Sequence, residues 1–214
     1  MYKNVIFDLD GTIIQSHPGI INAVRYALER LKLPMPSEEV IFSRIGPPLG
    51  ETFLFLGVKK GEENNAVSIY REYYNEIGIY ECNVYDGIPE QLEKLKSSGK
   101  TLLVATSKPR VFAKRILEKY AIADYFDYID GSNLDNTMTD KAALIIHALN
   151  QVGEKPDSSA VMVGDTKYDI LGAKQAGIPS AGVLYGYGTK EDLIKHGADI
   201  IIPKTEDIYN CICE

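Results

Sequence analysis

Short apolar runs alternate with amphipathic segments along most of the chain. Val5-Ile6-Phe7 opens the series, and the later runs TLLVAT (101–106) and AVMVG (160–164) lack the polar alternation of half-buried strands. This pattern predicts strands at residues 5–8, 101–106, 128–131, 160–164, 180–184 and 199–202. Apolar residues at helical spacing predict helices at 88–98, 110–119, 140–152, 167–176 and 189–196. Such alternation is typical of an α/β fold with a doubly wound, largely parallel sheet.

Residues 19–80 break this rhythm. The pattern there predicts consecutive helices and no strand, with glycine- and proline-rich breaks between them. The expected helices span 19–31, 37–43, 51–56 and 62–79. An all-helical block after the first strand, before the alternation resumes, indicates an inserted subdomain. We therefore predict a Rossmann-like α/β core formed by residues 1–15 and 82–214, with a small α-helical subdomain inserted at 16–81.

Composition and charge argue against some classes of binding partner. The chain has 214 residues, a formal net charge of −7 and an isoelectric point near 5.1, which argue against a surface for a nucleic acid polymer. No apolar run approaches the ~20 residues that cross a bilayer, and the first residues lack a signal-peptide pattern, so we expect a cytoplasmic protein without a membrane partner. The three cysteines form no disulfide framework, which suits a reducing compartment. The oligomeric state stays open between monomer and homodimer.

Acidic side chains follow two of the predicted strands, at the edge where ligands bind in doubly wound sheets. Asp8 and Asp10 follow the first strand, and alternate residues of an extended chain point the same way. Asp165 follows AVMVG at the same edge. Three clustered carboxylates are costly without a counter-ion. Mg²⁺ prefers a site with a small number of hard oxygen ligands and with room for water and substrate.

Hydrogen-bond donors and a cation follow the other strand ends. Thr106 and Ser107 supply hydroxyls after TLLVA, and Lys141 supplies an ammonium at the start of a predicted helix. These groups suit phosphate oxygens, and together with the acids they indicate phosphoryl chemistry. Asp169, four residues after Asp165, either joins the acids or complements a helix dipole. Each residue alone has an ordinary structural explanation, and only their joint occurrence points to a site.

Two glycine-containing segments imitate nucleotide-binding motifs and fail on inspection. Gly99-Lys100-Thr101 resembles the end of a P-loop, but Lys94 stands where the first glycine is needed and a strand follows the motif. Gly186-Tyr187-Gly188 resembles the start of a dinucleotide fingerprint, but Glu191 occupies the third glycine position. We assign neither segment a nucleotide-binding role.

The strand-end residues resemble the motifs of the haloacid dehalogenase superfamily of phosphatases, and the resemblance covers essentially the whole chain. Residues 8–12 (DLDGT) resemble the first motif, Thr106-Ser107 the second, Lys141 the third, and 164–169 (GDTKYD) with the following ILGAKQAG the fourth. The helical insertion is similar to the cap of the phosphoglycolate phosphatase and β-phosphoglucomutase branch. The segments IGPPLGETF, VATSKP and GSNLD are similar to sequences described as phosphoglycolate phosphatases or 5′-nucleotidases.

The resemblance implies a Mg²⁺-dependent hydrolase of small phosphomonoesters that works through an aspartyl-phosphate. It implies that Asp8 is the nucleophile and that Asp10 acts first as general acid and then as base. Asp8, the backbone carbonyl of Asp10 and Asp165 would hold Mg²⁺, with Asp169 as a further ligand, bound directly or through water.

The same resemblance implies how the phosphoryl group and the substrate are bound. Thr106 and Lys141 would bind the transferred phosphoryl group, and backbone amides around Leu9 and Ser107 would complete the cradle. The cap would close over the substrate and exclude water. In the cap, the loop 43–49 (SRIGPPL) carries Arg44, which would bind a carboxylate or a second phosphate of the substrate. His17 lies at the cap junction, where we expect it to contact the substrate.

Two other functions share much of this residue pattern. A phosphosugar mutase of the β-phosphoglucomutase type would use the same scaffold but transfer the phosphoryl group back to a sugar phosphate instead of to water. A phospho-accepting receiver module also combines acids, a hydroxyl and a lysine on a doubly wound sheet. It has no helical cap, however, and no use for the acid two residues after the phosphorylated aspartate. The natural substrate is left open.

Overall fold

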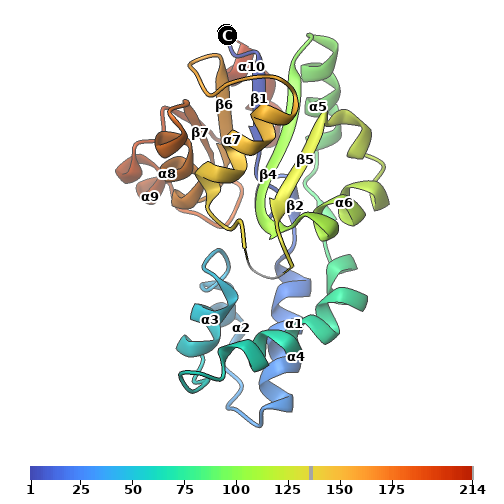
Figure 1. Cartoon of the computed structure of the whole chain (residues 1–214), viewed down its shortest axis with the longest axis vertical. Helices are drawn as coiled ribbons and strands as arrows, with labels where there is room; N and C mark the ends of the chain where they lie inside the picture. Colours follow the sequence, from blue (N-terminus) through green and yellow to red (C-terminus); the bar gives the residue numbers. More distant parts are fainter. Residues whose placement is uncertain (135–136, 214) are drawn as a thin grey trace. The chain divides into compact units, whose positions relative to one another are not determined.

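The computed structural model describes residues 1–134 and 137–213 (Figure 1). Asp135, the last residue of the GSNLD segment, lies outside the described residues. The chain forms two compact units, Met1–Gln15 with Val84–Glu214 and, inserted between these segments, Ser16–Asn83. The second junction lies between residues 83 and 84, whereas the sequence pattern predicts it between residues 81 and 82.

A six-stranded parallel sheet is the centre of the first unit. Its order is β5 (Tyr128–Ser132), β4 (Thr101–Pro109), β1 (Asn4–Phe7), β6 (Ala160–Gly164), β7 (Ser180–Val183), β8 (Ile200–Ile202). The structure confirms the predicted doubly wound parallel sheet, and each predicted strand is present. The strand β4 continues through Pro109, beyond the predicted end at Thr106, because it pairs with β5 as far as Ser132 after a register shift.

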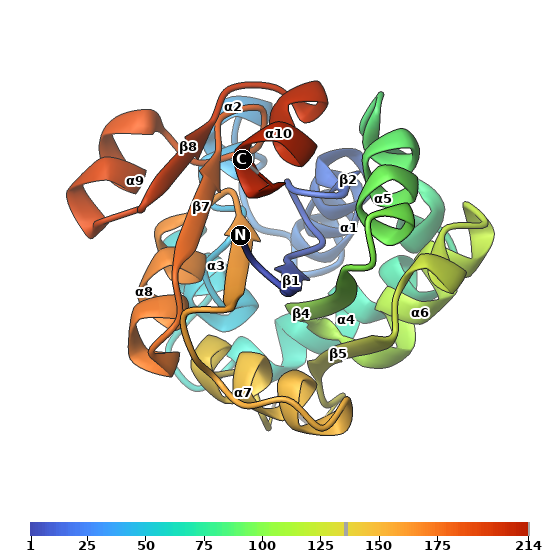
Figure 2. The ribbon, with the colours of Figure 1, turned by 90° about the horizontal axis from the view of Figure 1, so that it is seen from above.

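Helices cover both faces of this sheet. One face carries α7 (Lys141–Gln151), α8 (Lys167–Ala176) and α9 (Lys190–His196), and the other carries α5 (Ile88–Ser97), α6 (Arg110–Lys119) and α10 (Ile208–Cys213) (Figure 2). Short 3₁₀ turns, η2 (Ala123–Tyr125) and η3 (Thr205–Asp207), lie in the connections. The helix α10 was not predicted, because its six residues are too few to show a helical period.

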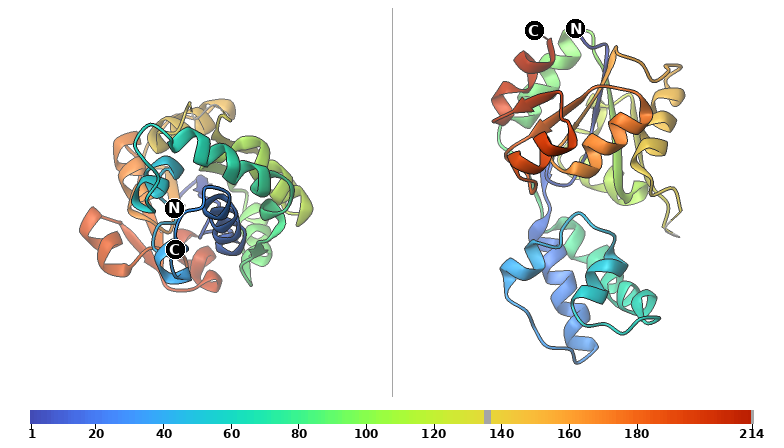
Figure 3. Two further views of the ribbon diagram at one scale, coloured as in Figure 1. Left: turned by 90° about the horizontal axis from the view of Figure 1, so that it is seen from below. Right: turned by 90° about the vertical axis from the view of Figure 1, so that its left-hand side faces the viewer.

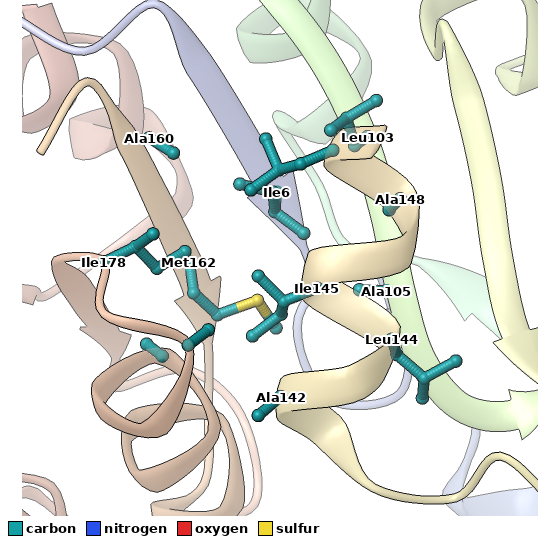
Figure 4. Close-up of a cluster of buried hydrophobic side chains, with 13 residues drawn as sticks. Ile6, Leu103, Ala105, Ala142, Leu144, Ile145, Ala148, Ala160, Met162 and Ile178 are labelled. Atoms are coloured by element: carbon teal, nitrogen blue, oxygen red, sulfur yellow. The ribbon is translucent and has the colours of Figure 1, made fainter. Parts of the chain in front are cut away.

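One cluster of buried apolar side chains in the first unit lies between the sheet and α7 and α8. Figure 4 shows Ile6 of β1 and Met162 of β6 facing Ile145 of α7. These three residues are 0% exposed, as are Leu103, Ala105, Leu144, Ala148, Leu149, Ala160 and Ala173 of the same cluster. The uninterrupted apolar runs of β4 and β6 follow from this burial on both faces.

The inserted unit is helical, with α1 (His17–Arg30), α2 (Glu38–Phe42), α3 (Leu49–Phe55), α4 (Glu63–Glu76) and the 3₁₀ turn η1 (Gly78–Tyr80) (Figure 3). Within it, α4 packs against α1 and α3. Phe53 of α3 meets Tyr70 of α4 edge to face, with ring centroids 6.3 Å apart, and Tyr70 stacks on Tyr74. The strands β2 (Ile14–Gln15) and β3 (Asn83–Val84) form a separate two-stranded sheet. No helix in the described part of the chain is long and apolar enough to cross a membrane.

Ile145→Ala should destabilise the protein by about 2–5 kcal/mol, since it leaves a cavity among residues that cannot all move inward. Ile194→Ala in α9 is the matched control, because the Ile194 side chain is 54% exposed whereas Ile145 is fully buried. Urea unfolding followed by circular dichroism measures both variants. Equal losses in the two variants would contradict the proposed core.

Candidate active site

Three carboxylates are buried together at the carboxyl ends of β1 and β6. Asp8 follows β1 and Asp165 follows β6, and Asp169 lies in the first turn of α8. One oxygen from each lies within 4.8 Å of the others, and all three residues are buried. The Asp8 N–H donates to the Val163 carbonyl at 2.9 Å, so pairing of the strands holds the first acid beside the second. The sheet order, with β1 between β4 and β6, makes this convergence possible.

The Lys141 ammonium lies between two of these acids. Its Nζ is 3.0 Å from Asp8 Oδ1 and 2.8 Å from Asp169 Oδ1, and it donates to the Ala105 carbonyl at 3.1 Å. Lys141 is the first residue of α7, whose N-cap Asp140 accepts a hydrogen bond from the Ala143 N–H. Burial lowers the pKa of Lys141, but the negative charges of Asp169 and Asp8 raise it by more. The pKa of Lys141 therefore lies above the ordinary value. The lysine is therefore a fixed positive charge in the site.

Burial also shifts the proton affinity of Asp8. It raises the pKa of Asp8 to about 6, with Lys141 opposing the shift and Asp169 and Asp10 adding to it. The Asp8 carboxylate is thus more basic than an ordinary aspartate, although it remains ionised at neutral pH.

Asp165 has hydrogen-bond donors but no counter-charge. It is 0% exposed, accepts a bond from the Tyr187 N–H at 2.7 Å, and accepts a longer one from Thr12 Oγ1 at 3.4 Å. Among the residues that the structure describes, no lysine, arginine or histidine pairs with it. Burial raises its pKa well above the ordinary range, and Asp169 and Asp8 raise it further. A buried carboxylate in this position fits a bound cation, because a cation would replace the missing counter-charge.

Asp169 is already engaged through both oxygens. Its Oδ2 accepts bonds from the N–H and hydroxyl of Thr166, the N-cap of α8, and its Oδ1 pairs with Lys141. Asp169 therefore lies among the clustered acids and also belongs to the capping box at the start of α8.

The segment Gly186-Tyr187-Gly188 lies against Asp165. A β-carbon at Gly186 would be 2.3 Å from Asp165 Cβ, and one at Gly188 would be 1.9 Å from the Asp165 carbonyl oxygen. Only glycine permits this approach, which brings the Tyr187 N–H onto the carboxylate. Sequence reasoning rejected the segment as a nucleotide motif and missed this contact. Its place just after a predicted strand, at the same sheet edge as the acids, was the available signal.

The two predicted phosphate-binding hydroxyls at the end of β4, those of Thr106 and Ser107, differ in burial. Thr106 is 1% exposed, and its Oγ1 accepts a bond from the Lys108 N–H, which leaves its own proton to donate. Ser107 is exposed, and its carbonyl accepts a bond from Ser132 Oγ. On β1's side, the Leu9 side chain is buried in the core, so only its backbone is available to a ligand.

The remaining predicted site residues lie in different units. Asp10 belongs to the first unit, where its Oδ1 is 3.1 Å from the Lys108 ammonium. His17 and Arg44 belong to the inserted unit. There the His17 ring meets Phe42 edge to face, with centroids 5.5 Å apart, and the Arg44 guanidinium lies 4.4 Å from the centroid of Phe55.

The chain matches the family model described as haloacid dehalogenase-like hydrolase over residues 5–183, which include the three clustered acids, Thr106 and Lys141. The chain belongs to the haloacid dehalogenase-like hydrolase family.

Relatives in this family carry several names. A 5′-nucleotidase of Pseudomonas aeruginosa is 42% identical over 196 residues, covering 91% of this chain and 88% of the relative. A phosphoglycolate phosphatase of Vibrio parahaemolyticus is 30% identical, covering 98% of this chain and 96% of the relative. The tyrosine-protein kinase PtkA of Mycobacterium tuberculosis is 36% identical, covering 92% of this chain and 67% of the relative.

The fold has close counterparts in solved structures. The structure of a predicted phosphatase from Clostridium acetobutylicum superposes with a TM-score of 0.92 at 38% identity, covering 98% of this chain and 97% of the other. Together these findings confirm the predicted family, its hydrolase class and its fold. The phosphatase names among the relatives agree with the predicted phosphomonoester hydrolase.

Asp165→Asn should stabilise the metal-free hydrolase by on the order of 1 kcal/mol at pH 8, because it removes a buried charge while keeping the bond from Tyr187. A folded-state pKa raised above 3.8 means that the wild type loses stability as pH rises through that folded value. The difference between variant and wild type should therefore be largest at pH 8 and vanish near pH 4.

Urea unfolding in EDTA across this pH range measures the effect. Asp86→Asn, at an exposed aspartate, is the control and should show no such trend. A destabilised Asp165→Asn at pH 8 would show that the carboxylate is not a charge burden in the folded state.

Proposed function

We propose that the protein is a Mg²⁺-dependent phosphatase that hydrolyses small phosphomonoesters through an aspartyl-phosphate on Asp8. The observation that carries this proposal is the buried group of Asp8, Asp165 and Asp169 with Lys141 against Asp8. The group combines a carboxylate, a fixed cation and an acid that lacks a counter-charge. Such a set serves attack on phosphorus better than it serves structure, since it is costly to bury.

Asp8 has the geometry of an oriented nucleophile. Lys141 holds its Oδ1 at 3.0 Å, which leaves the other oxygen to attack phosphorus. As that O–P bond forms, the bond from phosphorus to the leaving oxygen breaks, and Asp10 gives the leaving oxygen a proton. Water then attacks the aspartyl-phosphate, Asp10 takes the water's proton, and inorganic phosphate and free Asp8 result.

The donors for the transferred group come from three segments. The Thr106 hydroxyl keeps its proton for a phosphate oxygen, because it accepts from the Lys108 N–H. Lys141 contributes its positive charge, and backbone amides near Leu9 and Ser107 complete the cradle. Thr106 and Lys141 are buried, so the hydroxyl dipole and the ammonium charge would act strongly on developing charge.

Mg²⁺ fits the uncompensated acid of the cluster. Asp8, Asp165 and the backbone carbonyl of Asp10 would hold it, and Asp169 would act through water, because both of its oxygens are engaged. When bound, the ion neutralises the negative charge that phosphate oxygens bring to the carboxylates. In this proposal Asp165 serves the metal alone.

The substrate class is a small anionic phosphomonoester, as in phosphoglycolate or a nucleoside monophosphate. Similarity to relatives named 5′-nucleotidase and phosphoglycolate phosphatase supports both compounds. The inserted unit, in its role as cap, would select between them. Arg44 would bind a substrate carboxylate or second phosphate, and His17 would contact the substrate. We place this reaction in the cytoplasm, by a monomer or homodimer.

Transfer to an acceptor other than water is the second candidate. The relative named tyrosine-protein kinase PtkA favours it, since that name implies a phosphoryl acceptor other than water. The phosphosugar mutase alternative is of the same kind. The two functions separate by product, because a phosphatase releases inorganic phosphate and a transferase conserves phosphoryl groups.

Asp8→Asn should reduce phosphate release from p-nitrophenyl phosphate to background, because the amide cannot attack phosphorus. The exposed Asp86→Asn variant should keep wild-type activity. Continuous release of p-nitrophenolate measures both. Near-normal turnover in Asp8→Asn would overturn the aspartyl-phosphate mechanism.

Removal of Mg²⁺ with EDTA should abolish activity, and added Mg²⁺ should restore it. Mg²⁺ should also raise the melting temperature of the wild type but not that of Asp165→Asn, because binding to the native state stabilises it. Differential scanning fluorimetry supplies this readout without turnover. A melting temperature that rises equally in both proteins would place the metal elsewhere.

A phosphate-release screen over phosphoglycolate, sugar phosphates and nucleoside monophosphates should identify the substrate class. β-Glucose-1-phosphate tests the mutase alternative, which would yield glucose-6-phosphate without phosphate release. Arg44→Met should raise KM most for substrates with a second anionic group, whereas p-nitrophenyl phosphate serves as the control substrate. An unchanged KM across the panel would remove Arg44 from substrate recognition.

A further inference from the structure

Lys108 is a buried lysine that the proposed chemistry has not used. It lies near the end of β4, and its side chain is 6% exposed. Lysines are almost never fully buried unless they are paired. Its backbone N–H donates to Thr106 Oγ1 at 3.1 Å, inside the segment where the pairing of β4 with β5 shifts register.

The backbone around Lys108 is fixed by two contacts with β5. A β-carbon at Gly131 would be 2.4 Å from the Lys108 carbonyl oxygen, so only glycine allows the strands to lie this close. Ser132 Oγ donates to the Ser107 carbonyl at 2.8 Å. The register shift and these contacts give Lys108 a defined place at the sheet edge.

The lysine side chain reaches Asp10. Lys108 Nζ is 3.1 Å from Asp10 Oδ1, an oxygen that is buried and accepts no hydrogen bond among the described residues. Lys141 contacts Asp8 and Asp169 instead. The two buried lysines therefore pair with different acids. Lys141 pairs with Asp8, the proposed nucleophile, and Lys108 pairs with Asp10.

We propose that Lys108 is a positioning residue that fixes the Asp10 carboxyl group for proton transfer to the leaving oxygen. This inference rests on the proposed function, in which Asp10 is the general acid and base. With Oδ1 paired with the ammonium, Oδ2 is the oxygen that would carry the proton, and the ion pair opposes rotation of the carboxyl group. The ammonium also stabilises the carboxylate that remains after the proton has left.

The expected consequence is a selective loss. An acid matters most when the leaving oxygen is strongly basic, as in an alkyl phosphate, and little when it leaves readily as p-nitrophenolate. Lys108→Met should therefore steepen the dependence of kcat/KM on leaving-group basicity. kcat/KM reports the steps up to phosphorylation of Asp8, in which Asp10 acts as the acid.

The experiment measures kcat/KM of wild type and Lys108→Met on a series of aryl and alkyl phosphates. We expect a loss of about tenfold to hundredfold on alkyl phosphates and less than about threefold on p-nitrophenyl phosphate. Lys108→Arg should recover most of the alkyl phosphate activity, because it keeps a cation at this place. An equal loss on both classes of ester would overturn the proposal.

A double variant tests whether Lys108 acts through Asp10. In the Asp10→Asn background, Lys108→Met should change kcat/KM by less than about twofold, since the group that it positions is gone. Independent, multiplying effects would overturn the proposal. Lys100→Met is the matched control, because Lys100 is 7% exposed and bonds to the Tyr2 carbonyl at the opposite end of β4. It should leave the leaving-group dependence unchanged, even if it lowers stability.

A crystal structure of Lys108→Met supplies a readout that needs no turnover. We expect the Asp10 carboxyl group to leave its wild-type orientation, and an unmoved Asp10 would overturn the positioning role. If wild type hydrolyses no ester while Asp10 moves in the variant, the proposed function fails and the positioning stands. Should Lys108→Met not fold, Lys108→Gln takes its place in each measurement.

Discussion

The Lys141 ammonium lies within 3.0 Å of Asp8 and 2.8 Å of Asp169, in a region from which water is largely excluded. The other features of the site depend on this contact. Without the cation, two buried carboxylates would face each other unpaired, and folding would favour their protonated forms. With it, Asp8 stays ionised at neutral pH although burial raises its pKa to about 6. The lysine thus keeps Asp8, the proposed nucleophile, charged where burial disfavours charge.

The negative charges of the cluster are only partly compensated. Asp165 has hydrogen-bond donors but no cation among the described residues. In the proposed function this incomplete neutralisation leaves Asp165 available to a metal ion, at a cost in stability. Enzyme sites commonly trade stability for function in this way. The glycines of the 186–188 segment also support the buried Asp165 charge. They let a backbone N–H reach its carboxylate at a place where any side chain would clash.

Topology explains why these groups meet. The strand order places β1 between β4 and β6, so the three segments with the first, second and fourth motifs end side by side. The third, Lys141, begins the helix that packs on β4 and β5 in the connection from β5 to β6. Lys108 enters the same region because β4 shifts register against β5 and stays extended past Thr106. A binding crevice at this point is what doubly wound sheets provide.

The sequence by itself determined the alternation of buried strands and amphipathic helices, the helical insertion, and the identity of the acids at strand ends. Each of these is a local property, set by side-chain period or by residue type next to an apolar run. Only the tertiary structure decided which residues pair. Lys108 on Asp10, Tyr187 on Asp165 and the double engagement of Asp169 join segments through sheet order, a register shift and a close glycine approach. Such contacts depend on distances between elements far apart in the chain, and no local pattern of residues encodes those distances.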